Sequence, residues 1–165
     1  MTKEIILSTG EVCLVDDDDY DYLNQWKWYC DLGYALKMQN DGEKRINIRM
    51  HRLITDCPSG LEVDHINHNR LDNRKKNLRI CTSKENSRNM RKIPNNGSSI
   101  YKGVSKREHI GLTTWRMKIT ADYCCEAVNL NFTNEIAAAN AYNYYASKLF
   151  GEYACLNECP HYEKR

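Results

Sequence analysis

Apolar and polar residues alternate in short runs over the first fifty positions of the chain. Such alternation is typical of β-strands that bury one face. The strands that it predicts are 11–15, 26–30, 34–38 and 46–50. Asn40, Asp41 and Gly42 lie between the last two runs and favour a tight hairpin turn. We therefore expect residues 1–50 to form a β-rich N-terminal region.

Four consecutive aspartates, residues 16–19, interrupt this region. A calcium loop of the helix–loop–helix type needs a glycine at its sixth position and a glutamate at its twelfth. Frames that start at Asp16 or Asp17 supply neither residue. We interpret the run as a turn that leads into a short helix at about 20–25, because carboxylates stabilise the N-terminus of a helix.

The middle of the chain has a different pattern, in which two short apolar runs, 61–66 and 78–81, flank a polar loop rich in asparagine and arginine. We predict that both runs are strands. Thr82 and Glu85 have capping-box spacing, in which a hydroxyl and a carboxylate each satisfy a nearby amide donor. A helix should therefore begin there and extend to about residue 92.

Residues 100–157 form another unit by their pattern, with predicted strands at 101–106, 115–120 and 127–132 and a helix at about 133–150. The helix is the only candidate to cover one face of the sheet, and Gly151 should terminate it. Its apolar stripe comprises Ala138, Ala141, Tyr142, Tyr145 and Leu149. The other face of the sheet should remain open and cationic.

These elements predict an α+β protein. The expected parts are the N-terminal β-rich region 1–50, a strand–loop–strand–helix module at 51–93, a linker at 94–99, a three-stranded antiparallel sheet packed on one helix at 100–157, and a tail at 158–165. The composition, 41% hydrophobic and 28% charged over 165 residues, excludes a disordered chain and a membrane protein.

No apolar run is long enough to span a membrane or to act as a secretory signal, so we expect a cytosolic protein without a membrane partner. The eight cysteines are then expected to be free thiols. A zinc site is the alternative interpretation, but its spacing is unusual. It would combine Cys124, Cys125, Cys155, Cys159 and His161.

Charge is distributed unevenly, although the formal net charge is only +2. Residues 1–50 hold six basic and ten acidic side chains, whereas residues 51–97 hold ten basic and five acidic ones. Residues 98–120 add five basic side chains against one acidic one. Two basic regions suggest two places where a polyanion docks, although charge runs are also typical of a solvated surface.

Asp64, His65 and Asn86 are the candidate catalytic group. A carboxylate and an amide oxygen are hard ligands that leave most of the Mg²⁺ coordination sphere to water and phosphate. Histidine titrates near neutrality and can take a proton from water, which suits phosphodiester hydrolysis. Because neighbouring residues on a strand face opposite sides, convergence of Asp64 and His65 requires the pleat to break after Val63.

The phrases DHINHN, LDNRKKNLR and TSKENSRN resemble those of HNH homing endonucleases from phages and introns. The resemblance covers about residues 50–92, and WKWY and MHRLI also resemble the N-terminal part of such proteins. It implies a ββα-metal fold that acts on double-stranded DNA with Mg²⁺ or Mn²⁺, in the cytoplasm of a bacterial host. His65 would be the general base, Asp64 and Asn86 the metal ligands, and Asn77 the residue that fixes the loop.

Residues 98–157 resemble the Apetala-two (ethylene-response-factor) DNA-binding domain through YKGV, WRMKI, EIAAANAYNYYA and GEYACLN. The resemblance implies that Lys102, Arg107, Trp115 and Lys118 lie on a DNA-facing sheet, although Trp115 could equally belong to the core. Ser105 and Thr120 stand where the plant domains usually have arginines. We therefore expect a different sequence preference.

Together these features predict a site-directed DNA endonuclease of homing type that acts as a monomer on DNA. The alternatives are a non-catalytic, sequence-specific DNA-binding regulator, and an RNA-directed or structure-specific nuclease. The predicted DNA contacts are Arg52, Arg70, Arg74, Lys75, Lys76, Arg79, Lys102, Lys106, Arg107, Trp115, Arg116 and Lys118.

Overall fold

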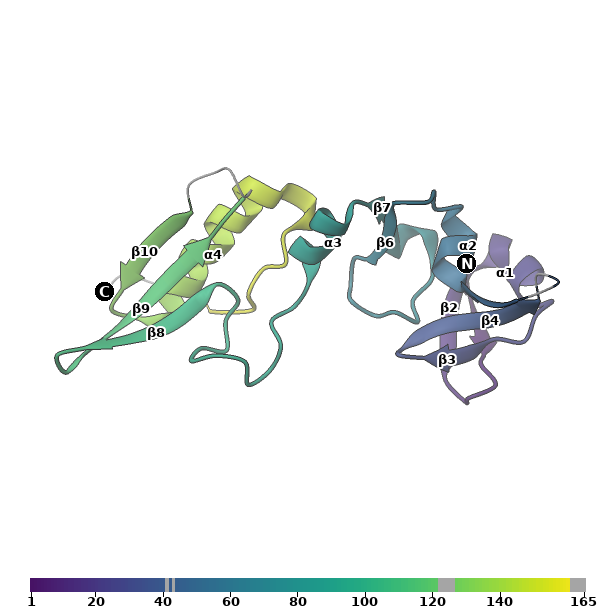
Figure 1. Ribbon diagram of the computed structural model, residues 1–165, viewed down its shortest axis with the longest axis horizontal. Helices are drawn as coiled ribbons and strands as arrows, with labels where there is room; N and C mark the ends of the chain where they lie inside the picture. Colours follow the sequence, from purple (N-terminus) through teal and green to yellow (C-terminus); the bar gives the residue numbers. More distant parts are fainter. Residues whose placement is uncertain (41, 43, 122–126, 161–165) are drawn as a thin grey trace. The chain divides into compact units, whose positions relative to one another are not determined.

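The computed structural model describes residues 1–40, 42, 44–121 and 127–160. These residues belong to two compact units, 1–87 and 88–165, and both contain strands and helices, as expected of an α+β protein (Figure 1). Part of the predicted hairpin turn, Asp41, lies outside the described residues, and so do Cys124, Cys125 and His161 of the alternative zinc set. The six described cysteines form no disulfide with one another.

The first unit opens with two small antiparallel sheets. One pairs β1 (Thr2–Ile6) with β2 (Val12–Asp16), and the other has the order β3 (Tyr29–Asp31), β4 (Tyr34–Asn40) and β5 (Arg45–Arg49). The pattern did not predict β1, and it placed the strand of β3 too early. Trp28 is buried and donates its indole N–H to the Leu23 carbonyl at 2.8 Å, so this stretch closes a helix end instead of pairing in a sheet.

Two short helices complete this part of the unit. Helix α1 (Asp17–Leu23) begins inside the acidic run, three residues earlier than predicted, and its first turn holds three aspartates that favour the helix N-terminus. Helix α2 (Met50–Thr55) was not predicted from the sequence.

The hydrophobic core of the first unit crosses the boundary that the sequence suggested at residue 50. Met50 is fully buried with residues of β1, β2 and β4, and Leu53 and Leu71 pack against the same cluster. The N-terminal region and the segment after it therefore share one core. The division between the two compact units falls at residues 87 and 88, before the predicted linker.

The segment that follows α2 has the predicted order of strand, loop, strand and helix. Strands β6 (Glu62–His65) and β7 (Leu78–Cys81) pair antiparallel, the short 3-10 helix η1 (Lys75–Asn77) precedes β7, and α3 (Ser83–Asn89) follows it. The capping box forms as predicted: Glu85 N–H donates to the Thr82 hydroxyl at 3.2 Å, and Thr82 N–H donates to the Glu85 carboxylate at 2.8 Å.

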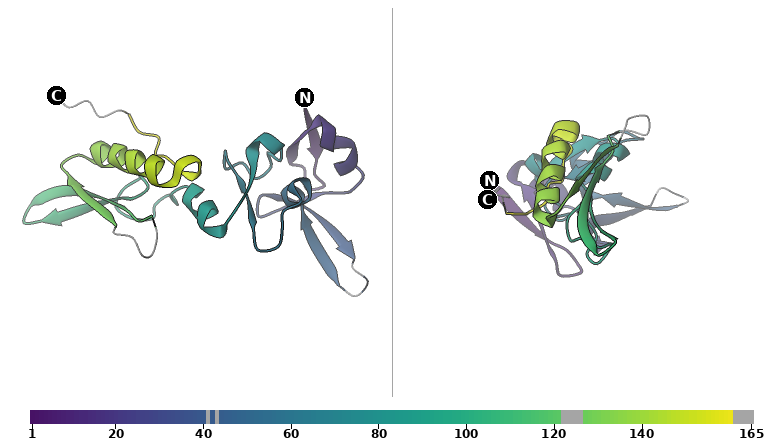
Figure 2. Two further views of the ribbon diagram at one scale, coloured as in Figure 1. Left: turned by 90° about the horizontal axis from the view of Figure 1, so that it is seen from above. Right: turned by 90° about the vertical axis from the view of Figure 1, so that its left-hand side faces the viewer.

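The second unit is a three-stranded sheet covered on one face by a long helix, as predicted (Figure 2). The strand order is β10 (Val128–Phe132), β9 (Leu112–Ile119) and β8 (Val104–His109), and the helix is α4 (Glu135–Phe150), followed by the 3-10 helix η2 (Gly151–Tyr153). Asn134 caps α4 by accepting from two backbone amides. The core includes Ala139 and Ala146, whereas Leu149 of the predicted stripe is 39% exposed.

Gly103 fixes how closely α4 approaches the sheet. A Cβ at this position would lie 2.2 Å from Cδ2 of Tyr142, and the backbone has a φ of +73° that side chains rarely adopt. Close contact between α4 and the start of β8 therefore needs glycine here. Among the described residues, none of the helices has the length and apolar character needed to cross a bilayer.

Candidate active site

Strand β6 carries both Asp64 and His65, and both residues are buried, each with 5% of its surface exposed. The pairing with β7 runs without interruption from Glu62↔Cys81 to His65↔Leu78. The predicted break after Val63 is therefore wrong. Because the pleat continues, Asp64 and His65 point to opposite faces of β6 and meet different partners.

Asp64 lies opposite Arg79 on β7, and the two side chains form an ion pair. Nη2 and Nε of Arg79 lie 2.6 Å and 2.9 Å from Oδ2 of Asp64. Arg79 was predicted to contact DNA, but in the structure it neutralises a buried carboxylate. A positive charge beside Asp64 is thus built into this face of the hairpin.

Glu62 joins Asp64 on the same face of β6, because the two residues are two positions apart on a strand. The side-chain amide of Asn86, on α3, donates to Oε2 of Glu62 at 2.5 Å. This bond engages the amide nitrogen, so the amide oxygen is the atom that a cation would meet. The donor set is two carboxylates and one amide oxygen, which fits the oxygen preference of Mg²⁺ or Mn²⁺. Among the described residues, no three His, Cys, Asp or Glu side chains already surround a metal position.

His65 faces the core side of β6, where its ring contacts three other side chains. Nε2 lies 3.2 Å from Oδ1 of the fully buried Asn73, and the ring of His51 packs edge-on at 5.0 Å between centroids. Burial lowers the pKa of His65, and burial also lowers the pKa of His51 to about 3. Both imidazoles are therefore neutral at neutral pH. Tyr34 packs against both rings, and the Arg70 guanidinium lies over the Tyr34 ring.

Asn77 links backbone groups across the loop between β6 and β7. Its Oδ1 accepts from Asn67 N–H at 3.0 Å, and its Nδ2 donates to the Asp72 carbonyl at 2.8 Å. The carboxylate of Asp72 is also buried, and it accepts two 2.6 Å hydrogen bonds from Arg74 and one from Asn67. The bonds from Arg74 are the largest cause that lowers the pKa of Asp72.

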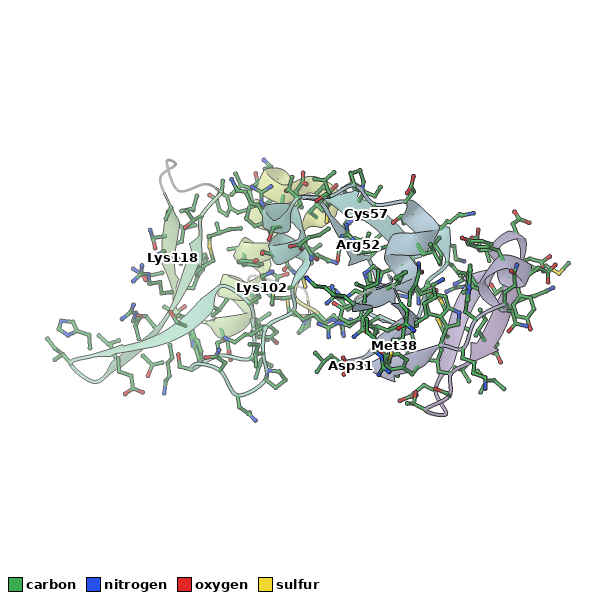
Figure 3. All side chains as sticks on the ribbon, turned by 45° about the vertical axis from the view of Figure 1, so that its right-hand side comes forward. Asp31, Met38, Arg52, Cys57, Lys102 and Lys118 are labelled. Atoms are coloured by element: carbon green, nitrogen blue, oxygen red, sulfur yellow. The ribbon has the colours of Figure 1, made fainter. Side chains whose placement is uncertain are left out.

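The cations predicted to bind DNA in the first unit mostly have partners within that unit. Arg52 donates to the carbonyls of Leu61, Cys57 and Pro58 (Figure 3). Arg70 donates to the Leu32 carbonyl, Arg74 pairs with Asp72, and Lys75 pairs with Asp19 of α1. Lys76 is exposed and forms no ion pair within the described part of the chain. The acidic run of α1 thus neutralises part of the basic loop.

In the second unit, the register of the strands separates the predicted DNA contacts onto two faces. The side of the sheet turned away from α4, here called the open face, carries Ser105, Arg107, Thr114, Arg116, Lys118, Asn129 and Asn131. Lys106 and Trp115 are cross-strand partners on the α4 side, and Trp115 packs against the core. The predicted place of Lys106 on the open face is therefore wrong, and Trp115 takes the core position that was its alternative.

Lys102 also departs from its predicted place. It precedes β8, and its ammonium group donates to the carbonyls of Arg88 and Met90 at 2.7 Å and 2.6 Å. Burial lowers the pKa of Lys102. Three predicted contacts, Arg107, Arg116 and Lys118, remain on the open face. Lys118 is labelled in Figure 3.

Three residues of the site were missed from the sequence. Glu62 could have been found from its two-residue spacing to Asp64. Asn73 and His51 could not, because Asn73 is held by Cys13 of β2, 60 positions away, and the approach of His51 depends on how α2 packs.

Residues 56–88 match the family described as HNH endonuclease. The chain is 32% identical over 152 residues to a protein of Acanthamoeba polyphaga mimivirus named as an uncharacterized HNH endonuclease, an alignment that covers 90% of this chain and 76% of that protein. It is also 40% identical over 65 residues to Protein 3.8 of Escherichia phage T7, which covers 39% of this chain and 51% of that protein. No solved structure matches the chain.

Proposed function

The chain belongs to the HNH endonuclease family, and we propose that it hydrolyses phosphodiester bonds of double-stranded DNA with residues 62–86. The observation that carries this proposal is the agreement between the family match over residues 56–88 and the strand–loop–strand–helix segment that contains Asp64, His65, Asn77 and Asn86. Cleavage at a chosen locus, as in homing endonucleases, is part of the proposal.

Asp64 and Asn86 would hold one divalent cation, Mg²⁺ or Mn²⁺. The clustering of Glu62, Asp64 and Asn86 around the α3 side of β6 supports this assignment. When bound, the cation supplies positive charge to the phosphate and to the departing oxygen. Arg79 occupies Oδ2 of Asp64, so binding of a cation would weaken or replace this ion pair. A guanidinium released in this way would be available to the negative charge of the substrate phosphate.

His65 would take a proton from the attacking water. Its neutral imidazole is held by Asn73, and Asn77 shapes the loop that starts directly after it. Because Asp64 and His65 face opposite sides of β6, the substrate phosphate would lie at the end of the strand, where groups from both faces can approach it. His65 is the last residue of β6, which supports this position.

The open face of the second unit would tether the nuclease to its site. A three-stranded sheet fits the major groove, and Arg107, Arg116 and Lys118 present their charges on one side of it. Asn129 and Asn131 lie beside them on β10, and asparagine can read adenine through paired hydrogen bonds. Tethering raises the concentration of a weakly selective nuclease at one locus.

The test is metal-dependent nicking of plasmid DNA by the full chain and by His65→Ala. Loss of the general base should reduce the rate by about 10²–10⁴-fold while DNA binding is kept. His68→Asn is the matched control, because asparagine tolerates the positive φ of 65° at this loop position. Equal cleavage by His65→Ala and the parent would show that the base is wrongly assigned.

A non-catalytic DNA-binding role is the second candidate, and the Asp64–Arg79 ion pair favours it, since the carboxylate that would hold a metal already has a cation. Tight, site-specific binding without nicking in Mg²⁺ or Mn²⁺ would support this role and reject the nuclease. Binding and nicking assays on the parent protein therefore distinguish the two functions.

A further inference from the structure

We propose that Asn73 orients the imidazole of His65 and selects its tautomer, with β2 holding Asn73 in position. The proposal deepens the proposed function, because it rests on His65 as the general base. Asn73 is a positioning residue in this scheme: it acts on His65 and does not touch the substrate.

Asn73 is completely buried and is held from two directions by β2. Its backbone N–H donates to the Leu14 carbonyl at 2.8 Å, and its side-chain Nδ2 donates to Sγ of Cys13 at 2.9 Å. The Leu14 N–H in turn donates to the Leu71 carbonyl at 2.8 Å. The loop is thus joined to a strand that lies about sixty residues earlier in the chain.

The bond to Cys13 determines which atom of Asn73 faces His65. Because Nδ2 is committed to the sulfur, Oδ1 is the atom at 3.2 Å from Nε2 of His65. A carbonyl oxygen only accepts hydrogen bonds, so Nε2 must carry the ring proton. In this tautomer Nδ1 is the nitrogen that can accept a proton, and a general base works only when that nitrogen is the one presented to water.

Asn77 has a different task. Both ends of its amide are engaged by backbone groups of Asn67 and Asp72, so it sets the path of the loop. The two asparagines therefore have separate roles: Asn77 shapes the backbone after β6, and Asn73 orients the imidazole ring of His65. This division explains why a buried amide lies on the core side of β6 instead of an apolar residue.

Cys13 tests what holds the Asn73 amide in its orientation. Burial raises the pKa of its thiol to about 11, so the sulfur stays neutral, and it also lies 3.4 Å from Sδ of Met50 in the core. Cys13→Ala removes the partner of Nδ2 but keeps the backbone bond between Asn73 and Leu14. Without that partner the amide can present either end to His65, so this variant, like Asn73→Ala, should show a mixture of tautomers.

The experiment records the ¹⁵N signals of the imidazole nitrogens in the metal-free full chain at neutral pH, with His65→Gln to assign the His65 ring. We expect a protonated Nε2 in the parent and in the matched control Asn73→Asp, which keeps an acceptor oxygen. Asn73→Ala should show a mixture of tautomers. A parent protein with the proton on Nδ1 would overturn the proposal. This measurement uses the parent alone, so it does not depend on whether the variants fold.

Cleavage kinetics give the second measurement. Asn73→Ala should lower kcat by about 10–100-fold, the range for residues that orient a catalytic group, with KM unchanged. An Asn73→Ala protein that keeps both the tautomer and kcat would also overturn the proposal. If the parent does not cut DNA, the proposed function fails, but the tautomer measurement still decides the role of Asn73.

Discussion

In the loop between β6 and β7, two of the basic side chains pair with carboxylates of their own unit, whereas on the open face of the second unit no basic side chain pairs with a carboxylate among the described residues. Arg74 is bound to the buried Asp72 and Lys75 to Asp19, but Arg107 and Lys118 form no ion pair among the described residues. The two regions have similar basic composition. Their difference teaches that cation density does not identify a DNA-binding surface unless the local acids are also counted.

The burial of the acids explains this contrast. Asp72 is 1% exposed, and a carboxylate taken out of water needs a cation and hydrogen bonds to remain charged. The positive charge of Arg74 therefore stabilises the fold of the loop between β6 and β7. The open face has asparagines as neighbours of its cations, and Asn129 accepts from Arg116 at 2.8 Å without cancelling its charge.

The largest expected effect concerns the Asp72–Arg74 pair. Arg74→Ala should lower the free energy of unfolding of the first unit by about 3 kcal/mol, because it leaves a buried carboxylate without its cation. Urea unfolding measures this change, and Lys76→Ala is the matched control, with an expected change within about 0.5 kcal/mol.

The same variant tests the comparison directly. If Arg74→Ala keeps its stability and instead weakens DNA binding, Arg74 is a phosphate contact and the two regions are alike. Binding should be measured in EDTA, so that cleavage does not interfere.

A smaller effect is expected for the open face. Arg107→Ala and Lys118→Ala should each weaken DNA binding by about 1 kcal/mol and reduce the slope of log affinity against log salt by about 1, with stability unchanged. Fluorescence anisotropy over a range of salt concentrations measures both quantities. Lys106→Ala is the control, because Lys106 lies on the α4 side and pairs with Glu108. An equal loss in Lys106→Ala would reject the open face as the docking surface.

Local patterns predicted much of this molecule. Strand β7 has the predicted bounds, and the capping box at Thr82 and Glu85 formed as expected, because both depend on neighbouring residues only. The three strands and the helix of the second unit also follow from alternation and helical spacing. The two interpretations of Trp115 could have been decided in favour of the core, since it alternates with Met117 and Ile119 on the core face of β9.

What the sequence did not predict depends on contacts between distant segments. The pairing of Lys75 with Asp19 joins residues 56 positions apart, and the bond between Asn73 and Cys13 joins residues 60 positions apart. The predicted break after Val63 assumed that one cation must attract both Asp64 and His65. The pleat remained regular because each side chain found its own buried partner, Arg79 for Asp64 and Asn73 for His65.

The smallest expected effect is the pH dependence of the stabilisation that the Asp72–Arg74 ion pair gives to the first unit. The hydrogen bonds from Arg74 lower the pKa of Asp72 in the folded state below its value in the unfolded chain. The stabilisation is therefore complete above the unfolded pKa of about 4 and is lost as the pH falls through the lower, folded pKa. The stability difference between the parent and Arg74→Ala should narrow as the pH is lowered from about 7 toward that range, as measured by urea unfolding.

Arg52 is the control for this pH effect, because it donates to carbonyl oxygens, which do not titrate. The difference between the parent and Arg52→Ala should stay constant over the same pH interval. A narrowing of equal size in both variants would mean that acid acts on the unit as a whole. If the stability difference narrows only for Arg74→Ala, the positive charge of Arg74 stabilises the folded state. Only a cation bound to a buried carboxylate that titrates produces this pH dependence.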